Sequence, residues 1–225
     1  MTNRDGVKAL IFDIDGTLVD SNDVHAHAWQ EAFEHFGKRF DYALIRSQMG
    51  KGGDLLVPDM LSAREIRSFG DELKAFRKEL FSKTYMEQIK PFPGIREAFE
   101  RLKAHGIELA LGSSGEPHEV KHYIELLGIG DLIEASTSKK DAQFSKPSPE
   151  IFEAAIEQLK ASDDKIAAVG DTPYDILAAH RAKIPVFAVL SGGFDREQLH
   201  KAEIIFDDVP ELVTRVEEID EYFRT

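Results

Sequence analysis

The chain has 225 residues, enough for one sizeable hydrophobic core and a small accessory unit, and its 42% hydrophobic and 31% charged residues are typical of a globular protein. A net charge of −13 argues against nucleic acid and against an anionic membrane surface as partners, because both attract cationic proteins. The absence of cysteine excludes disulfides and thiol nucleophiles. The N-terminus has no signal-peptide pattern and no window approaches the ~20 apolar residues of a membrane span, so we expect a cytoplasmic protein.

The first expected element is a buried strand. Residues 7–12 are apolar except for Lys8, a run typical of a parallel strand covered on both faces. Two acids follow it, Asp13 and Asp15, and Gly16 permits a sharp turn after them. In open α/β sheets, ligands bind at this carboxyl edge of the strands. We therefore expect the two carboxylates to have a chemical role.

The next stretch, residues 21–88, has helical periodicity and no strand pattern. Apolar side chains recur at helical spacing over 24–36 and again over 66–80, with a basic, glycine-rich loop at 46–54 between them. This pattern predicts an all-helical cap domain inserted into the rest of the chain. The predicted domains are a cap at 21–88 and a core made of 1–20 and 89–225.

Several side chains of this cap have simple structural interpretations. We expect Trp29 to pack inside the cap rather than to contact a substrate. We expect the basic residues of the second helical stretch to form a solvated face. These residues are Arg64, Arg67, Lys74, Arg77 and Lys78.

Helices and strands alternate after a proline-rich return at 90–94. The predicted strands are 107–111, 132–135, 166–169, 186–190 and 204–206, with amphipathic helices between them. Such alternation predicts an α/β fold with a doubly wound, Rossmann-like parallel sheet and right-handed crossovers.

Polar residues lie where several predicted strands end or helices begin. In chain order they are Asp13 with Asp15, then Ser113, then Lys146, then Gly170 to Asp175. In this order and spacing they resemble the four motifs of the haloacid dehalogenase superfamily of phosphohydrolases. The closest resemblance is to the subfamily of phosphoglycolate phosphatases and β-phosphoglucomutases, which carry a helical cap after the first motif. The resemblance covers nearly the whole chain, with Ser145 as a departure where the family often has glycine before the lysine.

The acids themselves predict a bound cation. If the first strand and the strand at 166–169 are neighbours, Asp13, Asp15, Asp171 and Asp175 meet at one sheet edge. Two carboxylates ~4 Å apart repel each other by about 4 kcal/mol at an effective dielectric of 20. An all-oxygen site of this kind suits Mg²⁺, which also accepts phosphate oxygens. Mg²⁺ is therefore the expected cofactor.

The resemblance implies a role for each motif residue. Asp13 would attack phosphorus and form an aspartyl-phosphate, and Asp15 would act as general acid and then as general base. To begin protonated, Asp15 would need a raised pKa, which burial and a neighbouring carboxylate favour. Ser113 and Lys146 would bind the transferring phosphoryl group. The implied metal ligands are Asp13, the backbone carbonyl of Asp15 and Asp171, with Asp175 in support.

Other residues are candidates for substrate binding. They are Thr17, His25, Lys51, Ser114 and Gly115. The helix that begins near Pro117 would direct its N-terminus towards the same edge. Because a closing cap excludes water and favours small ligands over proteins, a small phosphorylated metabolite is the expected substrate.

A phosphatase that hydrolyses a small phosphate monoester is the predicted function. A phosphomutase is the alternative, since His25 occupies the place of a hinge histidine in the mutases. Thr17, where mutases commonly have valine, and Lys51, in a loop where they have an arginine, favour the phosphatase. The family's dehalogenases need no Mg²⁺ and lack this pattern of acids. A non-catalytic phosphate-binding module is a further alternative, and the oligomeric state, monomer or homodimer, is left open.

Overall fold

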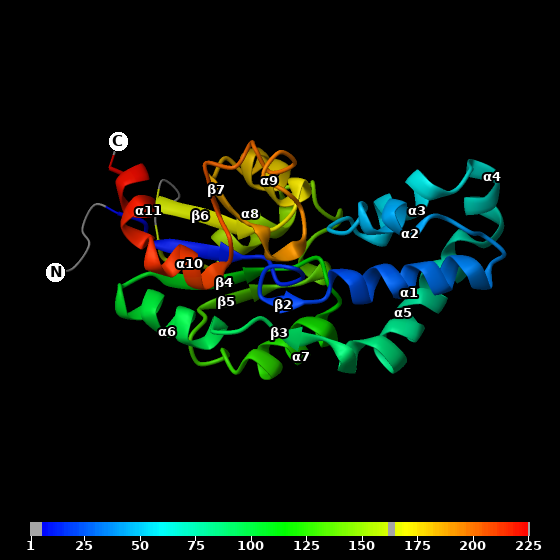
Figure 1. Ribbon diagram of the computed structural model, residues 1–225, viewed down its shortest axis with the longest axis horizontal. Coiled ribbons are helices and arrows are strands. Elements are labelled where there is room, and N and C mark those ends of the chain that lie inside the picture. Colours follow the sequence, from blue (N-terminus) through cyan, green and yellow to red (C-terminus); the bar gives the residue numbers. More distant parts are fainter. Residues whose placement is uncertain (1–5, 162–164, 225) are drawn as a thin grey trace.

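Six strands form one parallel sheet at the centre of the protein. In the computed structural model, which describes residues 6–161 and 165–224, the strand order is β5-β4-β1-β6-β7-β8 (Figure 1). The strands are β1 (Ala9–Phe12), β4 (Glu108–Gly112), β5 (Ala135–Thr137), β6 (Ile166–Gly170), β7 (Val186–Val189) and β8 (Ile204–Phe206). The chain winds outward from β1 to β5 and then from β6 to β8 on the other side. The predicted doubly wound α/β fold is therefore confirmed.

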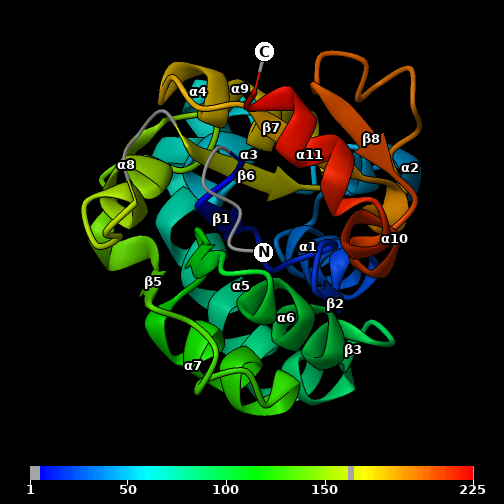
Figure 2. The same cartoon turned by 90° about the vertical axis from the view of Figure 1, so that its left-hand side faces the viewer.

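Helices cover both faces of this sheet (Figure 2). Successive side chains of β1 alternate between the faces, so Leu10 and Phe12 enter one core cluster while Ala9 and Ile11 enter the other. Residues of α6 (Ile95–Ala104), α7 (Pro117–Leu127), α10 (Val209–Thr214) and α11 (Val216–Tyr222) pack in the first cluster. Residues of α8 (Glu150–Ile156) and α9 (Pro173–Arg181) pack in the second.

The segment between residues 21 and 88 is helical throughout its named elements, and we call it the helical insert. It contains α1 (Asn22–His35), α2 (Tyr42–Arg46), α3 (Gly53–Met60), α4 (Ala63–Glu65) and α5 (Asp71–Leu80), with π-helical turns at Ile66–Gly70 and Phe81–Tyr85 and a 3₁₀ turn at Met86–Gln88. It has a separate hydrophobic cluster that includes Trp29, Phe33 and Leu73. In Figure 1 the insert lies beyond the carboxyl end of β1.

Two short strands connect the insert to the core. β2 (Val19–Asp20) and β3 (Lys90–Pro91) pair antiparallel, so the two crossing points of the chain lie side by side. The proline-rich return predicted at 90–94 thus begins with the two residues of β3. Pro91 is tolerated in this strand because a two-stranded ribbon has free edges.

One predicted strand is misplaced. The apolar run at 132–135 predicts a strand, but β5 begins only at Ala135 and continues to Thr137. Leu132 and Ile133 instead pack from a loop against the core cluster, partly buried. Burial of an apolar pair therefore does not require a strand here.

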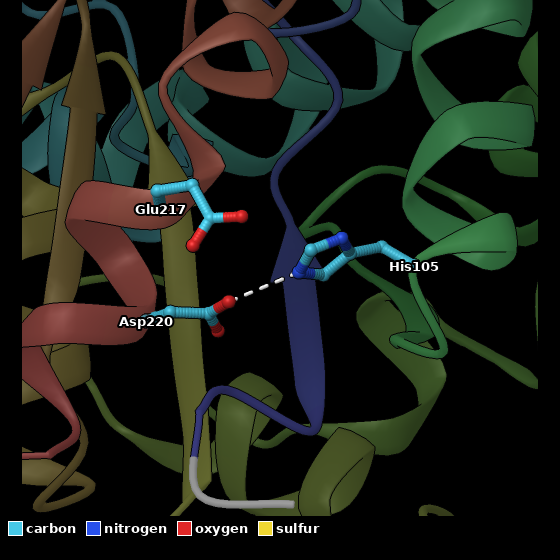
Figure 3. A group of neighbouring side chains, drawn as sticks. All are labelled: His105, Glu217 and Asp220. Atoms are coloured by element: carbon cyan, nitrogen blue, oxygen red, sulfur yellow. Dashed lines mark hydrogen bonds and ion pairs between the residues drawn. The ribbon is translucent and has the colours of Figure 1, made fainter. Parts of the chain in front are cut away.

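A buried carboxylate fastens the C-terminal helix α11 to the core (Figure 3). Asp220 Oδ1 accepts the backbone N–H of Val7 at 3.1 Å, and Oδ2 lies 2.9 Å from Nε2 of His105, which follows α6. Glu217 lies beside them, one helical turn away on α11. Because Val7 precedes β1, this cluster is at the amino end of the strands, opposite the acids that follow them.

Candidate active site

Three buried aspartates meet where β1 and β6 end. Asp13 directly follows β1, Asp171 directly follows β6, and Asp175 lies in the first turn of α9. Since β1 and β6 are neighbouring parallel strands, their carboxyl ends lie at the same edge of the sheet. One oxygen from each carboxylate lies within 4.8 Å of the others. The structure thus brings together three of the four aspartates that the sequence placed here.

The fourth, Asp15, turns its side chain towards the helical insert. Its Oδ1 accepts a hydrogen bond from Ser21 Oγ at 2.7 Å and lies 2.9 Å from His25 Nε2. The turn between the acids requires Gly16, which has a φ of +79° and whose Cβ would lie 2.3 Å from Asp171 Oδ2. The carboxylate of Asp15 is therefore not part of the cluster formed by the other three.

Lys146 supplies the positive charge of the cluster. Its Nζ donates to Asp13 Oδ1 at 2.5 Å and lies 2.8 Å from Asp175 Oδ1, and the side chain is buried. Burial alone would lower the pKa of Lys146, but the charges of Asp13 and Asp175 outweigh it and raise the pKa above its ordinary value. The ammonium group thus stays charged between two carboxylates.

The acids outnumber this single cation. Burial raises the pKa of Asp13 to about 7, and the charges of Asp175 and Asp15 act in the same direction, against the opposing effect of Lys146. Burial, with Asp175 and Asp13, also raises the pKa of Asp171 well above its ordinary value. A divalent cation would relieve this repulsion, and clustered carboxylate oxygens are the ligands that Mg²⁺ prefers. The donor set therefore fits the expected metal.

Hydrogen bonds from both sides orient Asp171. Thr17 Oγ1 donates to Oδ1 at 3.0 Å, and Asn22 Nδ2 donates to Oδ2 at 2.9 Å and to the carbonyl of Gly192 at 3.0 Å. Thr17 was expected to contact substrate, but its buried hydroxyl is directed at Asp171 and it does not line the cavity described below. The sequence alone does not predict this role for Asn22, the first residue of α1.

The loop after β4 forms another wall of the site. The buried Ser113 accepts the N–H of Gly115 at 3.0 Å through its Oγ, which shapes the loop. Ser114 and Gly115 line the cavity, and α7 begins just after them at Pro117. The predicted helix start at this edge is confirmed.

A cavity of about 140 Å³ lies between the core and the helical insert. The core contributes Asp13, Asp15, Lys146 and Asp175, together with Ser114, Gly115, Glu116 and Glu119. The insert contributes Asn22, His25, Trp29, Lys51 and Arg77, together with the glycines of its 49–53 loop. The cavity therefore lies directly over the acidic cluster.

The prediction that Arg77 belongs to a solvated face is wrong. Its guanidinium lies over the rings of Trp29 and Phe81, 5.1 and 4.6 Å from their centroids, and Nη2 donates to His25 Nδ1 at 2.5 Å. Because an arginine can only donate, His25 accepts at Nδ1 and its Nε2 donates to Asp15. Arg77, His25 and Asp15 thus form one chain from the insert to the second acid of the first motif.

This chain of contacts also corrects the expected pKa of Asp15. Burial raises that pKa, but the neighbouring His25, the hydrogen bond from Ser21 and the charge of Arg77 together lower it below its ordinary value. The carboxylate form of Asp15 is the favoured one in this arrangement.

Lys51 lines the cavity but already has partners within the insert. Its Nζ lies 2.5 Å from Asp59 Oδ2 and 2.6 Å from Gln48 Oε1, and 5.1 Å from the ring centroid of Tyr174 in the core. It therefore does not offer an uncompensated charge to a substrate.

The insert and the core are also linked beside the cavity. Asp54 accepts Ser145 Oγ at 2.6 Å and the Ser145 backbone N–H at 3.2 Å, next to Lys146. The loop passes so close that a Cβ on Gly52 would lie 1.9 Å from Ser145 Oγ. Arg46 Nη2 donates to the carbonyl of Gly192 at 2.5 Å. The insert is thus closed over the acidic cluster.

Comparison with known proteins gives a consistent assignment. Residues 10–189 match the family model described as haloacid dehalogenase-like hydrolase. The chain is 28% identical over 214 residues to the phosphorylated carbohydrates phosphatase of Thermotoga maritima, covering 93% of this chain and 98% of that protein. It is 28% identical over 197 residues to the phosphoglycolate phosphatase of Yersinia pseudotuberculosis, covering 85% and 84%.

A solved structure shows the same architecture. The crystal structure of a hydrolase from Pseudomonas syringae superposes with a TM-score of 0.80 at 29% identity, covering 94% of this chain and 99% of the other. Among the described residues, every helix is too short or too polar to cross a lipid bilayer. The family match extends from β1 to the end of β7 and includes all the motif residues of the acidic cluster. The chain therefore belongs to the haloacid dehalogenase-like hydrolase family.

Proposed function

We propose that this protein is a Mg²⁺-dependent phosphatase that hydrolyses the phosphate monoester of a small metabolite through an aspartyl-phosphate on Asp13. The observation that carries the proposal is the position of Asp13. It lines the cavity, accepts a hydrogen bond from Lys146, and has a carboxylate oxygen within 4.8 Å of one from Asp171 and one from Asp175. The family match and the phosphatase relatives support the reaction class.

Asp13 and Asp171 would hold the metal, with the backbone carbonyl of Asp15 as a further ligand and Asp175 in support. Asp175 Oδ2 already accepts the backbone N–H and hydroxyl of Thr172, at 3.0 and 2.6 Å, which leaves Oδ1 beside Lys146. When bound, Mg²⁺ would neutralise phosphate charge and make phosphorus more electrophilic. Asp175 would thus act mainly by holding Lys146 in place.

Asp13 would act as the nucleophile. Lys146 binds its Oδ1 and favours the charged carboxylate, which the attack requires. The bond from a carboxylate oxygen of Asp13 to phosphorus forms as the bond from phosphorus to the leaving oxygen breaks. Lys146 also offers its positive charge to the phosphoryl oxygens during transfer.

Asp15 would transfer a proton in each of the two steps. It would protonate the leaving oxygen, and then remove a proton from the water that attacks the aspartyl-phosphate. The contacts with His25 and Ser21 favour its carboxylate, which is the form needed for the second step. The negative charge of a bound phosphate would raise the proton affinity of Asp15 for the first step.

A phosphomutase would require a grip on a second phosphate. The contact of His25 with Asp15 is compatible with either reaction. Lys51, however, is paired with Asp59, and Arg77 is engaged with His25, so neither is a free phosphate ligand. We therefore favour hydrolysis.

The experiment is a release assay on a panel of small phosphate monoesters, with Mg²⁺ or with a chelator, beside the Asp13→Asn variant. We expect inorganic phosphate only from the unmodified protein with Mg²⁺. Isomerisation of a hexose 1-phosphate without phosphate release would instead establish a mutase. Phosphate binding with no turnover of any ester would establish a non-catalytic module.

A further inference from the structure

The turn after β7 lies between the acidic cluster and the helical insert. It is the 3₁₀ turn Leu190–Gly192, and Gly193 follows it. A Cβ on Gly192 would overlap Asp171 Oδ2, and one on Gly193 would lie 2.8 Å from Arg46 Nη2, closer than a real Cβ comes to another atom. The backbone of this turn therefore packs directly against a proposed metal ligand on one side and against the insert on the other.

Two side chains of the insert donate to the same backbone carbonyl in this turn. The carbonyl oxygen of Gly192 accepts Asn22 Nδ2 at 3.0 Å and Arg46 Nη2 at 2.5 Å. A carbonyl oxygen has two lone pairs, so these donors use its full capacity. Asn22 is the buried first residue of α1, and Arg46 is the last residue of α2. The carbonyl is therefore fully bonded only while α2 lies against the core.

Asn22 also bonds the proposed metal ligand through the same amide group. Its Nδ2 donates to Asp171 Oδ2 at 2.9 Å as well as to Gly192, so its two N–H groups have one acceptor each. Gly16 closes the other side of this contact, since a Cβ there would overlap both Nδ2 and Oδ2. Asn22 thus fixes the position of the Asp171 carboxylate relative to the Gly192 carbonyl.

Arg46 is oriented by other residues of the insert. Its Nε donates to Asp23 Oδ1 at 2.8 Å, and the same oxygen accepts Tyr42 Oη at 2.6 Å. These contacts connect the start of α1 to both ends of α2. Because Arg46 is held by the insert and Gly192 belongs to the core, any opening of the insert withdraws the guanidinium from the carbonyl.

We propose that Asn22 is a positioning residue for Asp171, and that insert closure and Mg²⁺ binding favour each other through the Gly192 carbonyl. This inference rests on the metal site of the proposed function. With Asp171 fixed by a bound cation, Asn22 and the carbonyl that Arg46 bonds in the closed insert are fixed as well. Closure in turn holds that carbonyl, and so the aspartate, in place. The coupling is reciprocal, because its free energy is the same from either site.

Calorimetric titration with Mg²⁺, without substrate, measures the effect on metal affinity. Asn22→Leu keeps the approximate side-chain size and removes both donors, and we expect the Kd for Mg²⁺ to rise about tenfold. Arg46→Met removes only the donor on α2, and we expect a rise of about fivefold. Arg64→Met, at an exposed position elsewhere on the insert, is the matched control and should bind Mg²⁺ normally. A normal Kd in either Asn22→Leu or Arg46→Met would overturn the inference. Arg46 is only partly buried, so its variant decides the question if Asn22→Leu does not fold.

The single tryptophan of the chain reports on closure. Trp29 is 5% exposed and lines the cavity between insert and core, so opening would admit a soluble quencher to its ring. We expect Mg²⁺ to lower acrylamide quenching of the unmodified protein by roughly half and to leave that of Arg46→Met unchanged. An equal Mg²⁺ effect in both proteins, or none in an unmodified protein that binds Mg²⁺, would overturn the coupling and leave the phosphatase proposal standing. An unmodified protein that binds no Mg²⁺ would refute the proposed metal dependence and the inference together.

Discussion

Lys146 reaches Asp13 across 133 residues of sequence, donating to its Oδ1 at 2.5 Å from a fully buried position. The same ammonium lies 2.8 Å from Asp175. It therefore balances part of the charge of the acidic cluster and orients the proposed nucleophile.

Replacing this lysine tests its contribution to turnover. For Lys146→Met we expect kcat to fall by a factor of about 10²–10³, the range typical of losing one hydrogen-bond donor that stabilises the transition state. Steady-state kinetics on any accepted ester provides the measurement. Lys140→Met, at an exposed position near the same loop, should retain normal kinetics. A Lys146→Met enzyme with more than about a third of normal kcat would exclude this role.

Removal of Mg²⁺ should make stability depend on pH. The folded-state pKa of Asp13 is raised to about 7 from 3.8, so its protonated form stabilises the folded protein below about pH 4, and this contribution is lost as pH rises through 7. The Tm of the metal-free protein should therefore fall between about pH 4 and pH 7 and level off above that range.

Mg²⁺ competes with protons for these carboxylates, so the rise in Tm that it causes should grow over the same pH range. Thermal unfolding with and without Mg²⁺ measures both effects. In Asp13→Asn the pH dependence should be weaker. An Mg²⁺ effect of the same size at pH 5 and pH 8 would contradict the expected competition.

The link between Asp54 and Ser145 should couple insert closure to the position of Lys146. The hydrogen bonds are partly exposed, so we expect Asp54→Asn and Ser145→Ala each to lower kcat/KM by about fivefold, or ~1 kcal/mol. If the two act together, the double variant should lose little more than either single variant. Fully additive losses would mean that the contact does not couple them. Glu72→Gln, exposed elsewhere on the insert, serves as a control.

The buried Asp220 should matter for stability and not for catalysis. Asp220→Ala removes the acceptor of the Val7 N–H and of His105, which we expect to lower the free energy of unfolding by about 2 kcal/mol. Denaturant unfolding measures this loss, and kcat should stay within about twofold of normal. Glu217→Gln, its exposed neighbour, should change neither quantity. A catalytic defect in a folded Asp220→Ala protein would show that the two ends of the sheet are coupled.

The sequence predicts the acidic cluster well because strand ends are visible in it. Asp13 and Asp171 each follow a buried apolar run that forms a strand. Because these two strands are parallel neighbours, the two acids lie together at the same edge of the sheet. Lys146 has no such local signal, and only its place in the order of the four motifs predicts its role. The order of motifs does not predict where each side chain points. Thr17 is expected to bind substrate, but its hydroxyl donates to Asp171.

The insert was less predictable because its side chains depend on how helices are rotated against the core. Arg77 occurs among other basic residues, and nothing in its spacing distinguishes it from a solvated lysine or arginine. Its burial against Trp29 and Phe81 follows from tertiary packing.

The most direct test of the central claim is to trap the covalent intermediate. Protein mixed with substrate and Mg²⁺ is quenched within one turnover and treated with borohydride, which reduces an aspartyl-phosphate to homoserine, and the peptides are read by mass spectrometry. We predict homoserine at position 13 and nowhere else, and none when substrate is omitted. Rapid phosphate release with an unmodified Asp13, or with the label at Asp15, would contradict the assignment of Asp13 as the nucleophile.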